Sequence, residues 1–523
     1  MERKSDLIII LVILIVASFF RLWKLSKIPP GLYPDVAING NEAFFSLKNR
    51  DFKVFYPENY GREGLMIWLI ALSFSIFGVS IFSIKIVAAI IGILTVFGTF
   101  LFTKELFQFS EKRSRKIAFF SSFFLAISFW HVNFSRIGFR AILVPFVLTF
   151  SLYFLLRSFK RKSIFDSAIS GIFFGLGFYT YTSFRMAVLI LPILFFCFFV
   201  LAKKENWEKK FFLLILIFLI VTFFVALPIG VYFLKNPEHF SSRASPVMIF
   251  SAEDPLKEFL KSLILHLGMF NFYGDPNWRH NMAKSPQLIF PVGILFLIGV
   301  CLAIKESFKF RSNLQSSINN LQLLIWFFVM LLPGVLTREG IPHSLRVVGT
   351  IPPTFIFAGI GANFLWEKIE KSKKYSLFLK NIGILFLILI AVLEGYRYFF
   401  VWARKPEVKS EFTSELLEMG NYLNSLQEDL EKYVIVNRGG VFVSWAKNLP
   451  MPAQTIMFLE ISKYGKVRSE YLLPEDIEKI KIEKKGVVLP MSFDEKIFEK
   501  LKEKFPEGKM KKVNDFFVYE VEK

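Results

Sequence analysis

The sequence predicts an α-helical polytopic membrane protein with about eleven transmembrane helices, followed by a smaller C-terminal α/β domain. The composition is the first observation behind this prediction. Of 523 residues, 54% are hydrophobic and 66 are Phe, which is more apolar than a soluble globular chain. The second observation is that apolar runs of close to 20 residues, long enough to cross a bilayer, recur through residues 1–402. After residue 403 the apolar runs shorten to strand length, which predicts a separate domain over 403–523.

Each predicted span corresponds to one apolar run. The eleven runs lie at about 6–23, 80–103, 116–135, 137–157, 166–183, 185–202, 210–234, 288–305, 319–336, 345–365 and 380–402. A further run, Gly64 to Gly78, has only 15 residues, whereas a spanning helix needs roughly 20. We expect this run to lie in the membrane interface without crossing.

The basic residues predict the orientation of the chain in the membrane. Short connections rich in Lys and Arg occur at 104–116, 157–165, 203–210, 305–318 and 366–380. If Gly64–Gly78 does not cross, all five connections fall on one side, which the positive-inside rule makes cytoplasmic. The loops 24–79 and 235–287 and the domain 403–523 are then extracytoplasmic. The predicted location is the cell membrane, with multiple passes.

The C-terminal domain is expected to alternate strands and amphipathic helices. Predicted strands are Tyr433–Val436, Thr455–Leu459, Gly486–Leu489 and Phe516–Val521, and predicted helices lie near 411–430, 475–482 and 493–504. This part has no glycine-rich phosphate loop, no Cys and no His. We therefore expect it to recognise an acceptor or to cover the membrane part, and not to hold the catalytic residues.

Charge and cysteine content exclude several function classes. The net charge of +21 would suggest nucleic acid in a soluble chain, but here it is explained by Lys and Arg beside the spans. No nucleic-acid partner is expected. The two cysteines, Cys197 and Cys301, lie inside apolar runs, so neither a disulfide framework nor a thiolate metal site is predicted.

An acidic segment follows the first span. Asp35 lies in an aromatic-rich turn punctuated by Gly and Pro, a setting in which we expect a non-helical loop that holds the side chain at the membrane surface. Glu42 and Glu63 follow in the same segment. Glu63 has a simpler interpretation as a carboxylate favoured by the helix dipole at the start of the next helix. We interpret the segment as a candidate catalytic loop.

Cations near the predicted outer ends of the helices form a second group. It comprises Lys85, Arg136, Arg140, Arg185, Arg346 and Arg397, with His131, His343 and Glu394 close by in the sequence. Snorkelling explains any one of these cations. Six cations on six helices at one level indicate a bound anion, and the phosphate of a lipid is the anion always available there.

Several stretches together resemble a known family. They are RLWKLSKIPPGLYPDVAINGNEA, NYGREGLMIWLIALSFSIFG, HVNFSRIGFRAILVP, GLGFYTYTSFR, FNFYGDPNWRHN and IPHSLRVVGTIPP, which cover most of residues 20–355. The chain resembles the GT-C superfamily of polyprenyl-phosphate-sugar-dependent glycosyltransferases, in particular the protein mannosyltransferase-like and aminoarabinose-transferase-like branch. The C-terminal domain lies outside the resemblance.

The resemblance implies an enzyme and its reaction. Such proteins are inverting transferases that move a sugar from a polyprenyl-phosphate donor to a hydroxyl of a protein, lipid or glycan on the extracytoplasmic side. A loop carboxylate, commonly within an Asp-Glu pair, is the catalytic base, and here that position is Asp35. The pair reads Asp35-Val36, so the family's second acidic function would pass to Glu42 or Glu63.

The resemblance also implies binding residues. The predicted donor-phosphate group is Lys85, Arg136, Arg140, Arg185, Arg346 and His343. Some relatives bind a divalent metal through a loop glutamate and a histidine, which would be Glu63 with His280 or His343, whereas others need no metal. The expected partners are the polyprenyl-phosphate-sugar donor and membrane lipid, with the acceptor left open.

Two other classes remain as alternatives. A transporter or flippase of lipid-linked sugars is disfavoured because no repeats and no charges near helix midpoints are present in the sequence. A membrane assembly protein would leave the acidic segment and the outer cations without a role. Asp275, in the stretch YGDPNW, is interpreted as a turn residue.

Overall fold

A computed structural model describes residues 2–108, 110–241, 248–309, 313–372 and 375–522. The chain forms two compact units. We call Met1–Leu25 with Ala88–Trp402 the membrane unit, and Ser26–Val87 with Ala403–Lys523 the composite unit. The predicted boundary after residue 402 coincides with one junction between them. Residues 26–87, however, cluster with the C-terminal segment and not with the helices that flank them in the sequence.

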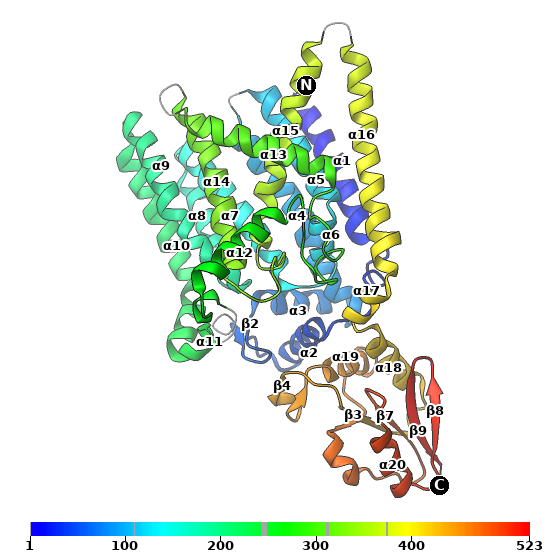
Figure 1. Cartoon of the computed structure of the whole chain (residues 1–523). Coiled ribbons are helices and arrows are strands. Elements are labelled where there is room, and N and C mark those ends of the chain that lie inside the picture. Colours follow the sequence, from blue (N-terminus) through cyan, green and yellow to red (C-terminus); the bar gives the residue numbers. More distant parts are fainter. Residues whose placement is uncertain (1, 109, 242–247, 310–312, 373–374, 523) are drawn as a thin grey trace. The chain divides into compact units, whose positions relative to one another are not determined.

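The membrane unit consists of helices, and its long helices run alongside one another in Figure 1. Its α-helices are α1 (Glu2–Leu22), α4 (Ile81–Leu106, which starts in the composite unit), α5 (Glu111–Ile127), α6 (Phe129–Phe134), α7 (Leu143–Arg161), α8 (Ile164–Gly177), α9 (Ile190–Lys204), α10 (Glu208–Lys235), α11 (Pro237–Ser241), α12 (Pro255–Gly268), α13 (Phe290–Ser307), α14 (Leu314–Val335), α15 (Ile351–Lys371) and α16 (Ser376–Tyr396). Shorter 3₁₀ or π segments are η1 (Arg140–Ile142), η2 (Thr182–Leu189), η4 (Ile249–Ser251), η5 (Val348–Thr350), η6 (Arg397–Val401) and η7 (Trp402–Arg404).

The predicted class, a polytopic helical membrane protein with a C-terminal α/β domain, is confirmed. Within the described residues, nine helical segments are long and apolar enough to cross a membrane, two fewer than predicted. The run at 116–135 is interrupted, because α5 ends at Ile127 and a separate helix starts at Phe129. The run at 166–183 ends as a helix at Gly177, after only 14 residues.

Close helix approach in this unit depends on glycine. A Cβ atom at Gly299 of α13 would lie 1.8 Å from the carbonyl oxygen of Phe357 in α15. A Cβ atom at Gly361 of α15 would lie 2.0 Å from the carbonyl oxygen of Leu295 in α13. Small residues let the backbones of membrane helices meet in this way. The two glycines therefore hold α13 directly against α15.

The composite unit combines helices with a five-stranded sheet, whose strands β3, β7, β9 and β8 are labelled in Figure 1. Its elements are α2 (Pro34–Asn49), β1 (Phe55–Tyr56), β2 (Arg62–Glu63), α3 (Leu65–Phe77), α17 (Pro406–Glu411), α18 (Ser414–Ser425), β3 (Glu431–Ile435), β4 (Phe442–Val443), η8 (Ser444–Ala446), β5 (Leu449–Pro450), α19 (Ala453–Tyr464), β6 (Glu470–Leu472), η9 (Pro474–Lys479), β7 (Lys485–Pro490), α20 (Glu495–Lys504), β8 (Lys509–Val513) and β9 (Phe516–Glu522). The strand order is β6-β3-β7-β9-β8. Strands β6, β3 and β7 pair in parallel, and β9 and β8 continue the sheet antiparallel.

One predicted strand of this unit is wrong. Thr455–Leu459 lies inside the helix α19, in which every residue from Ala453 to Ile461 is buried. A short segment that is apolar on all sides shows neither helical nor strand periodicity, so its type cannot be read from the pattern.

The short apolar run Gly64–Gly78 forms helix α3, whose 13 residues span about 20 Å, less than the bilayer core.

The segment before α3 packs on the C-terminal part. The Asn41 side-chain amide donates to Gln454 Oε1 (2.9 Å), and the Thr455 hydroxyl donates to the carbonyl oxygen of Leu32 (2.9 Å). Gly31 has φ +77°, and a Cβ atom there would lie 2.2 Å from the carbonyl oxygen of Phe412. These contacts explain why residues 26–87 and 403–523 form one unit.

Candidate functional site

Asp35 lies in the first turn of helix α2, so the expectation of a non-helical loop is wrong. Pro34 is the first residue of the helix, a position at which proline is common. Tyr33, just before it, has an extended backbone (φ −62°, ψ 140°). A carboxylate in the first turn is stabilised by the helix dipole. Asp35 is half-buried, and no side chain in the described parts of the chain forms a hydrogen bond or ion pair with its carboxylate.

Glu42 lies in the same helix, about two turns after Asp35, but in a different environment. Its Oε2 atom lies 2.7 Å from Nη2 of Arg62, and both side chains are buried. Arg62 also donates to Asn39 Oδ1 (2.8 Å) and to the carbonyl oxygen of Glu58 (3.3 Å). Burial raises the pKa of Glu42, and the guanidinium of Arg62 opposes that shift. The arrangement is a buried ion pair that ties α2 to strand β2.

Glu63 is buried in strand β2, opposite Phe55 of β1. Neighbouring residues of a strand point to opposite faces, so Glu63 points away from the side on which Arg62 meets Glu42. Glu63 belongs to the composite unit and His280 to the membrane unit. Their pairing at a metal therefore stays a prediction.

Lys85 and Arg136, two of the predicted phosphate-binding cations, are deeply buried and donate to backbone carbonyl groups within residues 20–29. Lys85 Nζ donates to the carbonyl oxygen of Pro29 (3.0 Å) and is 2% exposed. Arg136 is fully buried and donates to the carbonyl oxygens of Phe20 (2.9 Å) and Trp23 (2.7 Å). These contacts fix the backbone at the end of α1 and just after it.

The other three arginines lie on different elements of the membrane unit. Arg140 stacks on the ring of Tyr181, 5.3 Å from its centre. Arg346 donates to Thr337 Oγ1 (2.7 Å) and to the carbonyl oxygen of Glu339 (2.8 Å). Arg185 is half-buried and stacks on Phe240, 4.3 Å from the ring centre.

Arg185 also lines an open apolar groove of about 1060 Å³. The groove is formed mainly by side chains of α10, η2 and α11, among them Leu189, Phe223, Leu227, Phe233 and Phe240. Arg185 is its one charged lining residue among those described. A groove of this composition fits an extended hydrocarbon chain with one anionic group.

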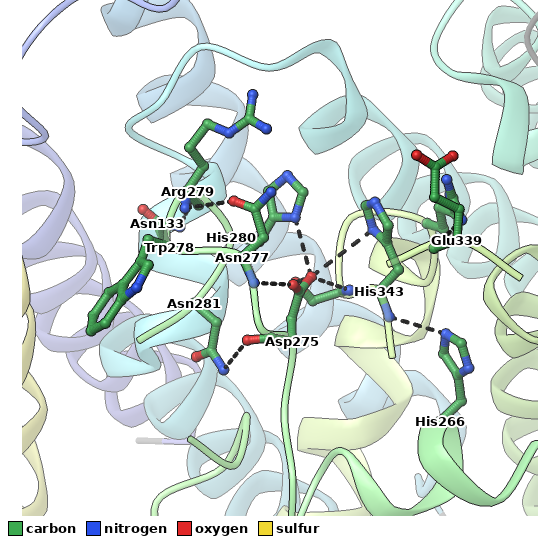
Figure 2. A network of polar contacts seen from close by, with 12 residues as sticks. Asn133, His266, Asp275, Asn277, Trp278, Arg279, His280, Asn281, Glu339 and His343 are labelled. Carbon is green, nitrogen blue, oxygen red and sulfur yellow. Dashed lines mark hydrogen bonds and ion pairs between the residues drawn. The ribbon is translucent and has the colours of Figure 1, made fainter. Parts of the chain in front are cut away.

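A polar cluster that sequence reasoning missed is centred on Asp275 (Figure 2). Asp275 is 1% exposed. Its Oδ1 accepts the backbone N–H of Asn277 (2.8 Å), and its Oδ2 accepts both the backbone N–H (2.7 Å) and the hydroxyl (2.8 Å) of Ser344. The same Oδ2 lies 3.1 Å from His280 Nδ1 and 3.9 Å from His343 Nδ1.

A third histidine supports this cluster from behind. His266 Nδ1 donates to the carbonyl oxygen of Ser262 (2.8 Å), which leaves Nε2 to accept the backbone N–H of His343 (3.1 Å). Burial lowers the pKa of His266 to about 4. Although burial acts to raise the pKa of Asp275, the neighbouring His280 outweighs it and lowers that pKa. Asp275 is therefore ionised at neutral pH.

Asp275, His280 and His343 form a candidate metal-binding group, since one ligand atom from each lies within 4.8 Å of the others. The structure thus joins His280 and His343, which were predicted as alternative metal partners of Glu63, and His343 was also predicted to bind the donor phosphate. Asp275 was interpreted only as a turn residue, because its contacts with residues 343 and 344 come from a loop far along the chain.

The fold of the chain is similar to that of solved membrane-protein structures. The chain superimposes on ArnT from Cupriavidus metallidurans bound to undecaprenyl phosphate with a TM-score of 0.59, covering 99% of this chain and 98% of that one at 12% identity. The chain has the GT-C fold. The GT-C fold extends to the archaeal oligosaccharyltransferase AglB from Archaeoglobus fulgidus in complex with an inhibitory peptide and a dolichol-phosphate, with a TM-score of 0.53 at 14% identity, covering 99% of this chain and 74% of that one.

Sequence comparison agrees with the GT-C fold. Residues 65–229 match the profile of the dolichyl-phosphate-mannose-protein mannosyltransferase family. An uncharacterised protein of Aquifex aeolicus is 24% identical over 364 residues, which are 68% of this chain and 63% of that curated relative. The resemblance seen in the sequence is confirmed, and the protein is a multi-pass membrane protein with a glycosyltransferase fold.

Proposed function

We propose that the protein is an inverting glycosyltransferase that moves a sugar from a polyprenyl-phosphate-linked donor to an acceptor hydroxyl, with Asp35 as the catalytic base. The observation that carries this proposal is the state of the Asp35 carboxylate. Two other acidic residues of the same segment are engaged: Glu42 with Arg62, and Glu58 with the backbone N–H of Ser444 (3.1 Å). Asp35 alone of these three is half-buried and unpaired among the described residues, as a general base requires.

The reaction needs a base more than an acid. The bond between the anomeric carbon and the phosphate oxygen breaks, and polyprenyl phosphate leaves with the electron pair. The acceptor oxygen forms the new bond to that carbon from the opposite face, so its configuration inverts. Asp35 takes the proton of the acceptor hydroxyl and passes it to solvent. Cations stabilise the charge that develops on the departing phosphate.

Arg140, Arg185 and Arg346 are our candidates for holding the donor phosphate. Arginine matches phosphate geometry with two parallel hydrogen bonds. Arg185 additionally borders the apolar groove, which suits the polyprenyl chain. The undecaprenyl phosphate named for ArnT and the dolichol-phosphate named for AglB support this class of donor. Lys85 and Arg136 are 2% and 0% exposed and donate to backbone carbonyl groups within residues 20–29, so we expect them to act mainly on the fold.

Removing Arg140 or Arg346 is expected to weaken use of the donor. Arg140→Ala and Arg346→Ala should each lower kcat/KM for the donor about 10- to 150-fold, which corresponds to the loss of about 1.5–3 kcal/mol from a hydrogen bond to a charged group. Arg→Lys should restore little where the contact is bidentate, because an ammonium group offers no paired donors. Titration of the donor in a transfer assay measures the effect.

Arg338 provides a matched control for these variants. It is exposed in the loop that contains Arg346 and makes one long contact, 3.4 Å to the carbonyl oxygen of Ser251. Arg338→Ala should leave donor use within about twofold of the parent, as for most exposed substitutions. Equal donor use by Arg140→Ala, Arg346→Ala and the parent would place the phosphate elsewhere.

We further propose that the catalytic segment and the C-terminal domain are extracytoplasmic, with the basic connections in the cytoplasm. In a protein whose Cys197 and Cys301 are replaced by Ser, a cysteine at exposed Gln427 should react with an impermeant thiol reagent in intact cells. A cysteine at exposed Ser110 should react only after the cells are opened. The reverse labelling pattern would invert the proposed orientation.

The proposal also differs from a flippase in its chemistry. A glycosyltransferase releases free polyprenyl phosphate from the sugar-loaded donor, whereas a flippase returns the donor intact. Incubation of the purified protein with labelled polyprenyl-phosphate sugars distinguishes the two.

A further inference from the structure

We propose that Asp275, His280 and His343 bind one divalent transition-metal ion of the zinc class. The proposed ligand atoms are Asp275 Oδ2, His280 Nδ1 and His343 Nδ1 (Figure 2). The site lies wholly within the membrane unit and outside its apolar spans. It does not depend on the proposed transfer reaction.

The spacing of the ligand atoms fits such an ion. Zinc bonds of about 2.0–2.2 Å with tetrahedral angles put two ligand atoms about 3.3–3.5 Å apart. Asp275 Oδ2 lies 3.1 Å from His280 Nδ1 and 3.9 Å from His343 Nδ1. The two separations from Asp275 Oδ2 therefore need to change by only about half an ångström or less to suit zinc, and the ligand atoms of the two histidines lie within 4.8 Å of each other.

The polar atoms around the site are arranged as outer partners of a metal ligand. Ser344 gives its backbone N–H and its hydroxyl to Asp275 Oδ2, and Asn277 gives its backbone N–H to Oδ1. Hydrogen bonds of this kind fix the direction of a coordinating carboxylate. His266 holds the backbone of His343 through the N–H of that residue. Hydrogen bonds from Ser344 and Asn277 thus orient the Asp275 carboxylate, and His266 fixes the backbone at His343.

The imidazole of His343 gives independent support for a bound ion. Its Nδ1 atom is buried, and it has no hydrogen-bond partner among the residues that the structure describes. A buried polar nitrogen without a partner is energetically unfavourable. The nearest acidic oxygen, at 3.9 Å, is too far for a hydrogen bond but at a suitable distance for a shared metal. A bound ion satisfies this nitrogen.

The chemistry of the ligands selects the ion. Two imidazole nitrogens and one carboxylate oxygen suit Zn²⁺, Co²⁺ or Ni²⁺, whereas Mg²⁺ and Ca²⁺ prefer oxygen ligands. Three protein ligands leave a tetrahedral ion one open position, which water fills. The ion would join the loop before α13 to the loop before η5, two segments that are 68 residues apart at Asp275 and His343.

The experiment uses the full chain, purified in detergent through an affinity tag that contains no histidine and then treated with a chelator. We expect the parent to take up close to one equivalent of Zn²⁺ by calorimetry and elemental analysis. With Co²⁺ we expect the intense visible absorption of a four-coordinate site, and with Mg²⁺ no heat of binding. His343→Ala should weaken Zn²⁺ binding at least tenfold, and His239→Ala, which changes a histidine of α11 outside the cluster, should bind like the parent.

His343→Ala is the informative variant because its Nδ1 makes no hydrogen bond and its backbone contact to His266 is retained. It should therefore fold, as circular dichroism would show. Zn²⁺ binding by His343→Ala equal to that of the parent would overturn the proposal. Should that variant fail to fold, the parent decides alone: no Zn²⁺ uptake, or a Co²⁺ spectrum of an octahedral ion, would refute the site.

Discussion

Asp35→Asn is expected to lower the rate of sugar transfer by about 10²- to 10⁴-fold, the usual contribution of a general base. The amide keeps the size and shape of the side chain and removes almost all of its basicity. No described residue pairs with the Asp35 carboxylate, so the substitution breaks no side-chain hydrogen bond in the part of the chain that the structure describes. Expression, folding and binding of the donor should therefore persist, which separates lost chemistry from lost structure.

Asp51→Asn is the matched control for this variant. Asp51 lies in the same segment, is exposed, and its carboxylate is 3.8 Å from Lys53 Nζ. It should transfer sugar within about twofold of the parent, as an exposed substitution does. Glu63→Gln should have a smaller effect than Asp35→Asn. A folded Asp35→Asn protein within a few-fold of the parent rate would remove Asp35 from the mechanism.

Glu42→Gln is expected to lower the free energy of unfolding of the composite unit by about 3–5 kcal/mol, because it leaves the buried Arg62 charge without its counter-ion. The side chain of Arg62 is 0% exposed, and Glu42 is its ion-pair partner at 2.7 Å. The remaining contacts to Asn39 and the Glu58 carbonyl group are dipolar and do not balance a full charge. Denaturant unfolding in detergent, followed by circular dichroism, measures the loss.

An exposed pair in the same segment gives the comparison. The side chains of Lys53 and Asp51 are 54% and 65% exposed, so Asp51→Asn should cost only about 0–1 kcal/mol. The double variant Glu42→Leu/Arg62→Met should be less destabilised than Glu42→Gln, since it removes both buried charges together. If Glu42→Gln unfolds at the same denaturant concentration as Asp51→Asn, the pair does not stabilise the unit.

The class of the fold could be predicted because long apolar runs directly reflect the thickness of a bilayer. The points at which a helix ends inside an apolar run were harder to predict from the sequence. The break between α5 and α6 falls at Ser128, and the apolar sequence on either side continues without a Gly or Pro to mark it. Helix α8 ends at Gly177, but its run continues with aromatic residues that composition alone cannot distinguish from a helix.

Helix α2 could not be predicted from local propensity. Its centre contains Asn39, Gly40 and Asn41, all weak helix formers. Packing on α19 overrides this preference: a Cβ atom at Gly40 would lie 2.7 Å from the ring of Phe458, and Asn41 bonds Gln454. Such contacts between distant segments leave no periodic signal in either one.

The Asp275 cluster was hidden for a related reason. The turn interpretation of Asp275 is correct for Oδ1, which accepts the N–H of Asn277 two residues later. The other oxygen is used by Ser344, 69 residues away. An Asp and a His five residues apart were visible in the sequence, but their meeting with His343 depends on how two loops fold against each other.

The central claim is that the protein cleaves a polyprenyl-phosphate-linked sugar with Asp35 as the base. The most direct test incubates purified parent and Asp35→Asn with a panel of hexosyl and pentosyl polyprenyl-phosphate donors and a membrane fraction as the source of acceptor. Free polyprenyl phosphate, quantified by mass spectrometry, reports the reaction whatever the acceptor is. We predict that the parent releases it from at least one donor and that Asp35→Asn does so about 10²- to 10⁴-fold more slowly. Release at the same rate by both proteins, or recovery of every donor intact after the parent has bound it, would contradict the account.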